Sequence, residues 1–584
     1  MILIFGGTTE GRLAVEVCEQ AGKPYYYSTK GESQQVEMEA GIRLTGAMTV
    51  RDIASFCRSK EIRCIIDAAH PFAENLHRAI AQAGLPVIRL SRNLGQRMDN
   101  VEYCHDYADA VERLRRKSPH RLLALTGVNG IARLKEYWID HPTIFRILNR
   151  PESLAGADAA GFPRAYLIYY KEDGGLPSME EEKALMQRLG CDALLTKQSG
   201  EQGGFETKVA AALQLGMKVF VIAPPRLPDT WQVVTGRHGL RRAIERLVPD
   251  FFPLKTGLTT GACATAATKA ALRSLLLHET PTEVDLTLPD GEVISVPVTI
   301  EGEGVASVVK DFSDDPDVTR GCRIMAHVTH SPADHHGVTF LQGQGVGRVT
   351  LPGLGIPVGE PAINPTPREM ITREVRALTQ ADVDVTLSVE GGEELAQRTF
   401  NSRVGVVGGI SIIGTSGIVS PFSNEAFVQS IGRELEVARA MGLCEVGLVS
   451  GKRGEEALQA EEPSLRVIHY GNFVGEALRK ASQLGFQRVV LGVMIGKAVK
   501  LAEGHLDTHS HKVLMNRDFL IQQAVEVGVA DAAERVAGIT MARELYGIMP
   551  PAFFSRISEL CLAHCRTVFP SGNLEFRLIC DNPV

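Results

Sequence analysis

The fold of the N-terminal half is decided by residues 2–22, which read ILIFGGTTEGRLAVEVCEQAG. Four apolar residues predict a buried strand, the two glycines predict a tight turn, and the spacing that follows predicts a helix over Gly11–Ala21. Backbone amides in such a turn, together with the helix dipole, can hold a pyrophosphate. The pattern satisfies half of the GxGxxG fingerprint, so a tight turn without a ligand is the alternative interpretation.

Alternating strand and helix patterns continue through the first 250 residues. Repeated βα units predict a parallel, doubly wound sheet that binds ligands at the carboxyl ends of its strands. The number of units predicts two Rossmann-like lobes, at about 1–125 and 126–250. Further strands are expected at residues 25–28, 63–67, 86–90, 121–127, 143–149, 165–170, 192–197 and 218–223.

The sequence changes character at VPDFFPLKTG (248–257), which has two prolines and no periodicity, and we place a domain boundary there. An Ala-rich helical stretch, followed by short strand patterns and Gly/Pro turns, predicts an α+β subdomain over 254–400. The βα alternation then returns and predicts a Rossmann-like subdomain over 401–584. Strands are expected in it at residues 445–450, 466–470 and 488–493, before a mostly helical end.

Composition limits the class of protein. The chain has 584 residues, more than a single hydrophobic core supports. Its net charge of −7 weakly disfavours a nucleic-acid partner, and no apolar run reaches the length of a membrane span. The start lacks the basic residues of a signal peptide, and the eleven cysteines form no CxxC, so we expect a cytoplasmic protein. The expected partner is a small molecule, and a homo-oligomer stays open.

Four motifs stand in order along the first 250 residues: GGTTEG (6–11), DAAHPFA (67–73), LALTG (123–127) and LLTKQSGEQGGFETKVAAA (194–212). Together they resemble the precorrin-6A reductase family, which implies hydride transfer from a reduced nicotinamide to one double bond of a tetrapyrrole. The catalytic candidates on this resemblance are Asp67, His70 and Lys197. The cofactor-binding candidates are Gly6, Gly7, Thr8, Thr9, Glu10, Gly11, Thr126, Gly127, Ser199 and Gly200.

Two of the catalytic candidates have other interpretations. A capping or core histidine is as good an interpretation of His70, and Lys197 could instead bind a substrate carboxylate. The second strand ends in Ser28-Thr29-Lys30 and not in an acid. A hydroxyl and basic cluster suits a 2′-phosphate, so Ser28 and Lys30 favour NADPH over NADH as the cofactor. A solvated loop charge is the alternative for Lys30.

The C-terminal half offers isolated polar candidates. Thr259 and Thr260 are candidate N-caps, and the small residues after them admit a ligand or, alternatively, tight core packing. Arg368 is available for a carboxylate. Loop capping is favoured over a metal for DDPDVTRG (314–321), and a helix start over a zinc site for GHLDTHSHK (504–512). No protein-bound metal is therefore expected.

An ordered set of motifs covers about 254–584. These motifs are TGLTTGACATAATKAA, DDPDVTRG, GQGVGRVTLPGLGIPVGEPAINPTPREMI, VGGISIIGTSGIVSP, YGNFVGE and GKAVKLAEGHLDTHS. They resemble the cobalt-precorrin-5B (C1)-methyltransferase family, which implies methyl transfer from S-adenosylmethionine to ring carbon 1 of a tetrapyrrole that brings its own cobalt. The expected methyl-donor residues are Gly408, Gly409, Gly414, Gly471, Asn472 and Gly475. The expected substrate-binding residues are Thr259, Thr260, Gly261, Arg368, Lys497 and His509.

Both resemblances belong to one chemistry, because the product of the methylation would be the substrate of the reduction. The sequence therefore predicts a bifunctional enzyme of cobalamin biosynthesis, in which fusion could help local hand-over of the intermediate. The alternative is a nicotinamide-dependent reductase fused to a non-catalytic ligand-sensing module. Binding of S-adenosylmethionine by the C-terminal half separates the two hypotheses.

Overall fold

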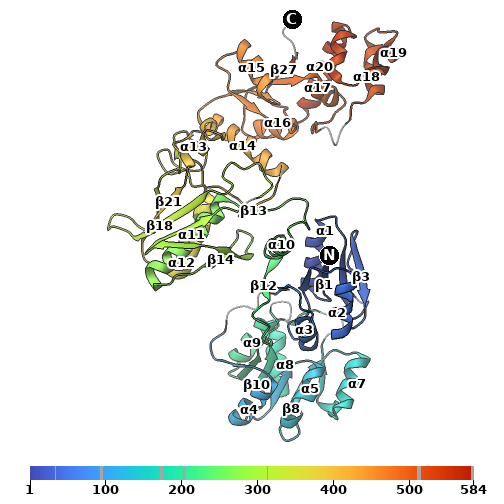
Figure 1. The fold of residues 1–584 in the computed structure, drawn as a ribbon, viewed down its shortest axis with the longest axis vertical. Helices are drawn as coiled ribbons and strands as arrows, with labels where there is room; N and C mark the ends of the chain where they lie inside the picture. The colour runs from blue at the N-terminus through green and yellow to red at the C-terminus, as the bar shows by residue number, and fades with distance from the viewer. Residues whose placement is uncertain are drawn as a thin grey trace. The chain divides into compact units, whose positions relative to one another are not determined.

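The computed structural model describes residues 1–32, 34–92, 97–170, 175–200, 204–311, 313–421, 423–509 and 514–580. Parts of two motifs lie outside this set: residues 201–203 of the fourth reductase-like motif and residues 510–512 of the motif with three histidines. The chain divides into two compact units (Figure 1). The first is Met1–Pro253 with Glu292–Ile294, and the second is Leu254–Gly291 with Ser295–Val584. Both units are mixed α/β with parallel sheets, as the alternating patterns predicted.

The first sheet of the first unit is parallel throughout, and its central strands are apolar on both faces because helices cover both. In order across the sheet, its strands are β12 (Gln232–Val234), β5 (Val87–Leu90), β4 (Cys64–Asp67), β1 (Ile2–Phe5), β2 (Tyr25–Thr29) and β3 (Gly41–Thr45). One face is covered by α1 (Thr9–Glu19) and α10 (Gly236–Leu247), and the other by α2 (Val50–Ser59) and α3 (Glu74–Ala81).

The second sheet of the first unit is also parallel throughout. Its strands are β6 (Val101–Cys104), β11 (Lys218–Ile222), β10 (Ala193–Lys197), β7 (Leu122–Leu125), β8 (Thr143–Ile147) and β9 (Leu167–Tyr169). One face is covered by α4 (Tyr107–Lys117), α5 (Val128–Arg133), α6 (Lys135–Trp138) and α7 (Pro151–Ala159), and the other by α8 (Met179–Leu189) and α9 (Phe205–Gln214).

The predicted lobe boundary near residue 125 is wrong. Strand β6 pairs with β11 and strand β7 with β10 in the second sheet, although β6 and β7 both lie before residue 126. After β11 the chain returns to the first sheet, where β12 pairs with β5 and α10 packs beside α1. The first lobe therefore has two separate segments, and each lobe needs its helices on both faces to bury its strands.

The second unit begins with an α+β part. Helix α11 (Thr260–Leu277) packs on β17 and β18 of a mostly antiparallel sheet, beside α12 (Pro365–Leu378). Across that sheet the order is β16 (Thr299–Gly302), β17 (Val305–Val309), β18 (Arg323–His330), β21 (Val383–Val389) and β19 (Val338–Gln342). Two-stranded ladders join β14 (Glu283–Thr287) to β15 (Val293–Pro297), β13 (Gly257–Leu258) to β23 (Ile418–Val419), and β20 (Arg348–Val349) to β22 (Val406–Val407).

The last part of the second unit is a parallel sheet with strands β25 (Val467–His469), β24 (Glu445–Val449), β26 (Arg488–Met494) and β27 (Asn573–Ile579). Helices α14 (Asn424–Ala440), α16 (Val474–Gln483), α17 (Ile495–Ala502) and α20 (Pro551–Arg566) cover one face, and α15 (Lys452–Glu461) covers the other. Helices α18 (Arg517–Glu526) and α19 (Ala532–Ala537) complete the helical end.

The predicted start of this last part at residue 401 is too early. Strands β22 and β23 pair with β20 and β13 of the α+β part, so residues 401–421 belong with what precedes them. The α/β part begins with α14. Among the residues that the structure describes, no helix has both the length and the apolar character needed to cross a membrane.

Candidate functional site

The glycine turn after β1 is built around a tyrosine. Gly7 adopts a φ of 94°, and its amide donates to the Tyr27 hydroxyl over 3.1 Å. The Thr8 hydroxyl caps α1 by accepting from the Gly11 amide (3.2 Å) and donates to the carbonyl of Ala68 (2.6 Å). One amide of the turn is therefore already bound by a side chain, and the turn is held to the neighbouring strand end.

Replacing Gly6 by alanine should destabilise the first unit. A Cβ at Gly6 would lie 2.3 Å from the Tyr27 ring, so the ring or the turn must move. Such overpacking costs about 1–3 kcal/mol. Denaturant unfolding followed by tryptophan fluorescence measures it, because Trp138 and Trp231 both lie in the first unit. Gly31→Ala, where a Cβ meets open space, is the control; an equal loss in both variants would contradict the prediction.

The end of β2 has a basic group that the sequence did not reveal. Ser28 is buried and Lys30 is exposed. Arg43 reaches across from β3, with its Nη2 3.5 Å from the Thr29 hydroxyl, and its Nε is buried with no hydrogen-bond partner among the described residues. An open pocket of about 500 Å³ adjoins this guanidinium. Arg43 was missed because β3 itself was not predicted.

Arg92 joins the carboxyl ends of the two sheets. Its guanidinium binds the Glu10 carboxylate at 2.7 Å from the first lobe and donates to the carbonyl of Ser199 over 3.1 Å from the second. Glu10 and Ser199 were predicted as cofactor-binding residues, and an arginine outside every motif joins them in the structure. Both lobes thus contribute polar groups to the same place.

His70 lies on the turn after β4, near Arg92 and Lys197, and is neutral near pH 7. Burial, and then the charges of Arg92 and Lys197, lower the pKa of His70 to about 4. The Nδ1 atom accepts from the Phe72 amide (3.2 Å), so it caps the turn as one interpretation expected. Since Nδ1 accepts, the neutral ring carries its proton on Nε2, which can donate to a ligand.

Lys197, the last residue of β10, faces groups from both lobes. Its Nζ lies 5.0 Å from the centre of the Phe72 ring and 5.8 Å from that of Tyr107. Burial, and then the charge of Arg133, lower the pKa of Lys197 to about 8, although Glu74 opposes the change. The ammonium therefore gives up its proton closer to neutral pH than an exposed lysine does.

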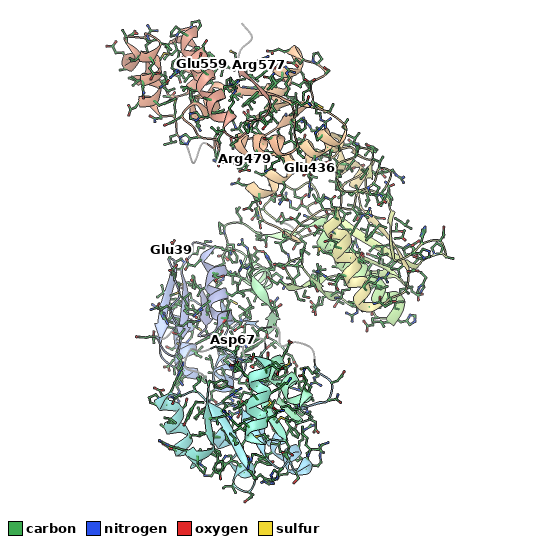
Figure 2. All side chains as sticks on the ribbon, turned by 180° about the vertical axis from the view of Figure 1, so that it is seen from behind. Glu39, Asp67, Glu436, Arg479, Glu559 and Arg577 are labelled. Atoms are coloured by element: carbon green, nitrogen blue, oxygen red, sulfur yellow. The ribbon has the colours of Figure 1, made fainter. Side chains whose placement is uncertain are left out.

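The remaining candidates of the first unit are more structural. Asp67 does not face the cleft as expected: it is fully buried at the end of β4 (Figure 2), and its carboxylate binds Arg89 at 2.8 Å and accepts from the Ala69 amide. A buried charge needs such a partner, so the pair holds the turn that carries His70.

The other cofactor-binding candidates of the first unit differ in exposure: Thr9 is exposed and Thr126 is buried. Gly127 and Gly200 have positive φ, at 74° and 72°.

Three expected substrate-binding residues of the second unit are buried in packing. Thr259 caps α11 by accepting from the Ala262 amide, and the Thr260 hydroxyl accepts from the Ile413 amide over 2.8 Å. A Cβ at Gly261 would lie 2.6 Å from Pro367 of α12. Because these groups are occupied by α12 and the 411–414 segment, the structure favours the tight-packing alternative.

The expected methyl-donor glycines fall into two separate groups. A Cβ at Gly414 would lie 2.3 Å from the Thr259 hydroxyl, and one at Gly409 would lie 2.4 Å from the carbonyl of Gly345, so both glycines pack within the α+β part. Gly408 has a φ of 77° and open space beside it. This first group of glycines therefore does not lie at the end of a parallel strand.

Arg368, an expected substrate-binding residue, is bound to the Glu360 carboxylate at 2.8 Å.

The second group, Gly471 to Gly475, follows β25 at the carboxyl edge of the last sheet. The Lys497 ammonium donates to the carbonyl of Gly471 and to the Asn472 side chain (2.6 Å), and burial lowers its pKa to about 8. The Gly475 amide donates to the carbonyl of Leu506 (3.1 Å). Lys497 thus holds the loop, and the His509 amide donates to Asp507 nearby.

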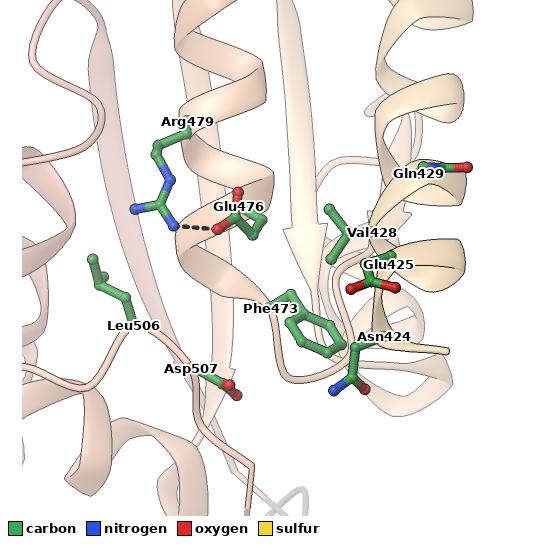
Figure 3. A pocket seen from close by; sticks show the side chains of 9 residues that line it. All are labelled: Asn424, Glu425, Val428, Gln429, Phe473, Glu476, Arg479, Leu506 and Asp507. Atoms are coloured by element: carbon green, nitrogen blue, oxygen red, sulfur yellow. Dashed lines mark hydrogen bonds and ion pairs between the residues drawn. The ribbon is translucent and has the colours of Figure 1, made fainter. Parts of the chain in front are cut away.

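A pocket of about 590 Å³ opens beside this loop (Figure 3). We call it the α14–α16 pocket, because the first turns of α14 and α16 and residues 506–507 line it. The residues that line it include Asn424, Glu425, Phe473, Glu476, Arg479 and Asp507. These residues come from segments far apart in sequence, so no local pattern could predict the pocket.

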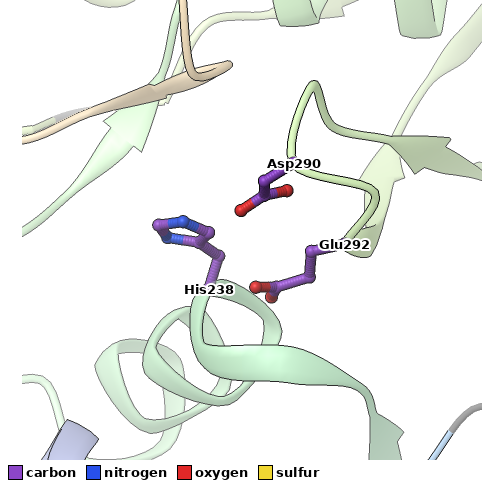
Figure 4. Close-up of side chains that lie close together, drawn as sticks. All are labelled: His238, Asp290 and Glu292. Carbon is purple, nitrogen blue, oxygen red and sulfur yellow. The ribbon is translucent and has the colours of Figure 1, made fainter.

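Figure 4 draws a further group, His238, Asp290 and Glu292. His238 and Glu292 are assigned to the first unit and Asp290 to the second. The group therefore defines no metal site within either unit.

Two doubly wound lobes with polar groups at their strand ends place the first unit among ligand-binding α/β proteins, and a second α/β unit with a strand-end pocket follows. Sequence models match both parts: "Precorrin-6x reductase CbiJ/CobK" over residues 1–245 and "CbiD" over 249–421. The chain belongs to the cobalt-precorrin-5B C(1)-methyltransferase family through its C-terminal part. It is a cobalamin-biosynthesis fusion of that family with the precorrin-6 reductase family, as the motifs predicted.

Two relatives agree with the assignment of the C-terminal part. The cobalt-precorrin-5B C(1)-methyltransferase of Prosthecochloris aestuarii is 44% identical over 348 residues, 56% of this chain and 94% of that protein. Its counterpart in Brucella canis is 43% identical, over 51% of this chain and 84% of that protein. A solved structure of CobK precorrin-6A reductase is 22% identical, over 42% of this chain and 97% of that chain, with a TM-score of 0.34. The two families make the enzyme bifunctional, and in general they imply nicotinamide-type and S-adenosylmethionine-type cofactors and a tetrapyrrole substrate.

Proposed function

We propose that the second unit methylates cobalt-precorrin-5B at C1 with S-adenosylmethionine and that the first unit then reduces the resulting precorrin-6A with NADPH. The observation that supports the reductase assignment is that Lys197, His70 and Arg92, which come from both lobes, lie close together. A reaction of the full chain with cobalt-precorrin-5B, S-adenosylmethionine and NADPH, followed by mass, tests the proposal. The mass should rise by one methyl group and then by two hydrogens; no methyl gain would support the sensor alternative.

The nicotinamide, when bound, supplies a hydride, and the chain's residues supply position, charge and a proton. Thr8 and the exposed Gly7 stand where a pyrophosphate would lie, at the amino end of α1. Lys197 donates the proton to the ring carbon next to the one that receives the hydride. The Nε2–H of His70 remains available to hold a ring carboxylate.

The basic groups at these strand ends suit a substrate with many carboxylates. Arg92 and Arg133 are each bound to one glutamate, Glu10 and Glu74. A guanidinium has five N–H donors, so each arginine retains donors for a substrate carboxylate. Glu10 and Glu74 offset the charges of the two arginines, so Lys197 leaves this group of five side chains with a net positive charge, although the whole chain has a net charge of −7.

Arg43 should select NADPH over NADH, because a 2′-phosphate at the end of β2 would meet its guanidinium. Arg43→Ala should raise KM for NADPH about tenfold or more, since a charge-assisted hydrogen bond contributes about 1.5–3 kcal/mol. KM for NADH should change by less than about twofold on the same grounds. Steady-state kinetics with both cofactors measures the effect. Arg51→Ala, exposed on α2, is the control, and equal losses for the two cofactors would refute the selection.

For the methyl transfer we place the donor at the carboxyl edge of the last sheet, where Gly471, Asn472 and Gly475 lie, in keeping with ligand sites of open parallel sheets. We also infer a cytoplasmic enzyme, because all eleven cysteines are free thiols and most are buried. Sedimentation of the full chain would decide between a monomer and a homo-oligomer, which the sequence leaves open.

A further inference from the structure

We infer that the aromatic rings of Phe72 and Tyr107 hold the Lys197 ammonium in place and keep it charged, which makes both residues positioning residues of the reductase. The inference rests on the proposed proton transfer and extends it to the side chains around the donor. Phe72 lies on the turn after β4 in the first lobe, and Tyr107 is the first residue of α4 in the second. Lys197 is therefore held from both lobes.

The Lys197 ammonium is held by aromatic rings and not by a carboxylate. Its Nζ lies 5.0 Å from the centre of the Phe72 ring and 5.8 Å from that of the Tyr107 ring. Within the part of the chain that the structure describes, this ammonium makes no hydrogen bond and no ion pair. An aromatic ring attracts a cation within about 6 Å of its centre, and more strongly where water is excluded. The two rings are thus the contacts that fix the ammonium.

The Tyr107 ring also carries a second cation. The guanidinium carbon of Arg133 lies 5.1 Å from the centre of this ring. Arg133 is in turn bound to the Glu74 carboxylate at 2.8 Å. Two cations beside the same ring repel each other, whereas the ring attracts both. Tyr107 therefore offsets part of the repulsion that Arg133 exerts on Lys197.

Tyr107 acts through its ring and not through its hydroxyl. The residue is 7% exposed, so the ring is shielded from water. Its hydroxyl is buried beside that of Thr126 and, within the described residues, forms no hydrogen bond of ordinary geometry. Burial raises the pKa of Tyr107 to about 12, so the phenol stays neutral and provides no negative charge for Lys197. The ring is what remains to attract the ammonium.

The rings oppose the groups that would remove the lysine's proton. Burial, and then the charge of Arg133, lower the pKa of Lys197 to about 8, while Glu74 acts in the opposite direction. His70 is neutral near pH 7 and adds no charge. A ring attracts the ammonium but not the neutral amine, so each ring favours the protonated form. Lys197 then keeps its proton near neutral pH until it passes it to the tetrapyrrole, and the amine left behind regains a proton from water.

Tyr107→Leu and Phe72→Leu should each lower the pKa of Lys197 by about 0.4 to 1.5 pH units, the effect of losing one desolvated cation–π contact. Leucine stays apolar, so the lysine remains desolvated while the ring is lost. Trace acetylation of the full chain with acetic anhydride over a pH series measures this pKa, because only the neutral amine reacts; the mass of the peptide that contains Lys197 gives the extent. The alkaline fall of kcat/KM for the reduction should move by the same amount.

Two matched variants separate the ring from a general loss of packing. Tyr107→Phe keeps the ring and should retain the acetylation midpoint of the wild-type chain. Tyr137→Leu removes a ring that is 0% exposed in the same hydrophobic core and stacks on His141, and it should leave the midpoint of Lys197 unchanged while lowering the melting temperature. Phe72 is only partly buried, so Phe72→Leu supplies the measurement should Tyr107→Leu not fold.

The outcomes distinguish this inference from the proposed function. An acetylation midpoint that stays at the wild-type value in both leucine variants overturns the inference, whatever the reduction does. A midpoint that moves as far in Tyr107→Phe or Tyr137→Leu as in Tyr107→Leu also overturns it, because the ring beside Lys197 is then not the cause. If the midpoint falls as expected and the pH profile of the reduction does not follow, the rings hold the charge as inferred, and it is the proton-donor role of Lys197 that fails.

Discussion

Lys197→Met should lower the turnover of the reductase by about 10²–10⁴-fold, the range of general acid catalysis, and leave the methylation unchanged. Methionine retains most of the length that lies over Phe72 and Tyr107, so the variant removes the proton and keeps the packing. NADPH oxidation under single-turnover conditions, with precorrin-6A supplied, measures the loss. Lys135→Met, exposed on α6, is the control.

The pH profile gives an independent readout of the same residue. The pKa of Lys197 is lowered to about 8, so the acid is present below pH 8 and disappears above it. The kcat/KM of the reduction should therefore be level below pH 8 and fall about tenfold for each pH unit above it. If Lys197 binds a substrate carboxylate instead, Lys197→Met should raise KM while kcat changes little, and that result would refute the proton-donor role.

Asp67→Ala should destabilise the first unit by about 3–5 kcal/mol, because it leaves a buried guanidinium without its carboxylate. Asp67 is 0% exposed and Arg89 is 3% exposed, and their 2.8 Å contact lies at the ends of β4 and β5. The double variant Asp67→Ala/Arg89→Met should recover much of the loss, since it removes both buried charges. Chemical denaturation followed by tryptophan fluorescence reports this unit, which contains Trp138 and Trp231.

The Asp250→Ala variant is the matched control for that experiment. Asp250 pairs with Arg63 at 2.6 Å, but the two side chains are 71% and 47% exposed, so water replaces the lost contact and stability should change little. A loss in Asp67→Ala no larger than in Asp250→Ala would show that the buried pair is not the support of the His70 turn. If the double variant does not regain the lost stability, the loss comes instead from the missing hydrogen bond between the Ala69 amide and the Asp67 carboxylate.

The sequence alone determined the class of fold and the identity of both halves. Residues 2–22 contain the strand, turn and helix that the structure shows, because apolar periodicity and glycine act over a few neighbouring residues. Thr259 was likewise recognisable as an N-cap. Ordered motifs identified the two families, which the comparisons confirmed.

Tertiary structure decided the lobes, the missed strands and the partners of the polar groups. Strands β3, β12 and β27 are short or half-exposed, and long-range pairing makes them strands; β12 returns to the first sheet from more than 130 residues beyond β5, its neighbour. Arg92 likewise lies 82 residues from Glu10 and 107 from Ser199 in sequence, and the pocket residues of α14 lie far in sequence from residues 506–507. Local patterns determine which elements form, whereas the burial of one element against another determines which side chains meet, and that information is spread over the whole chain.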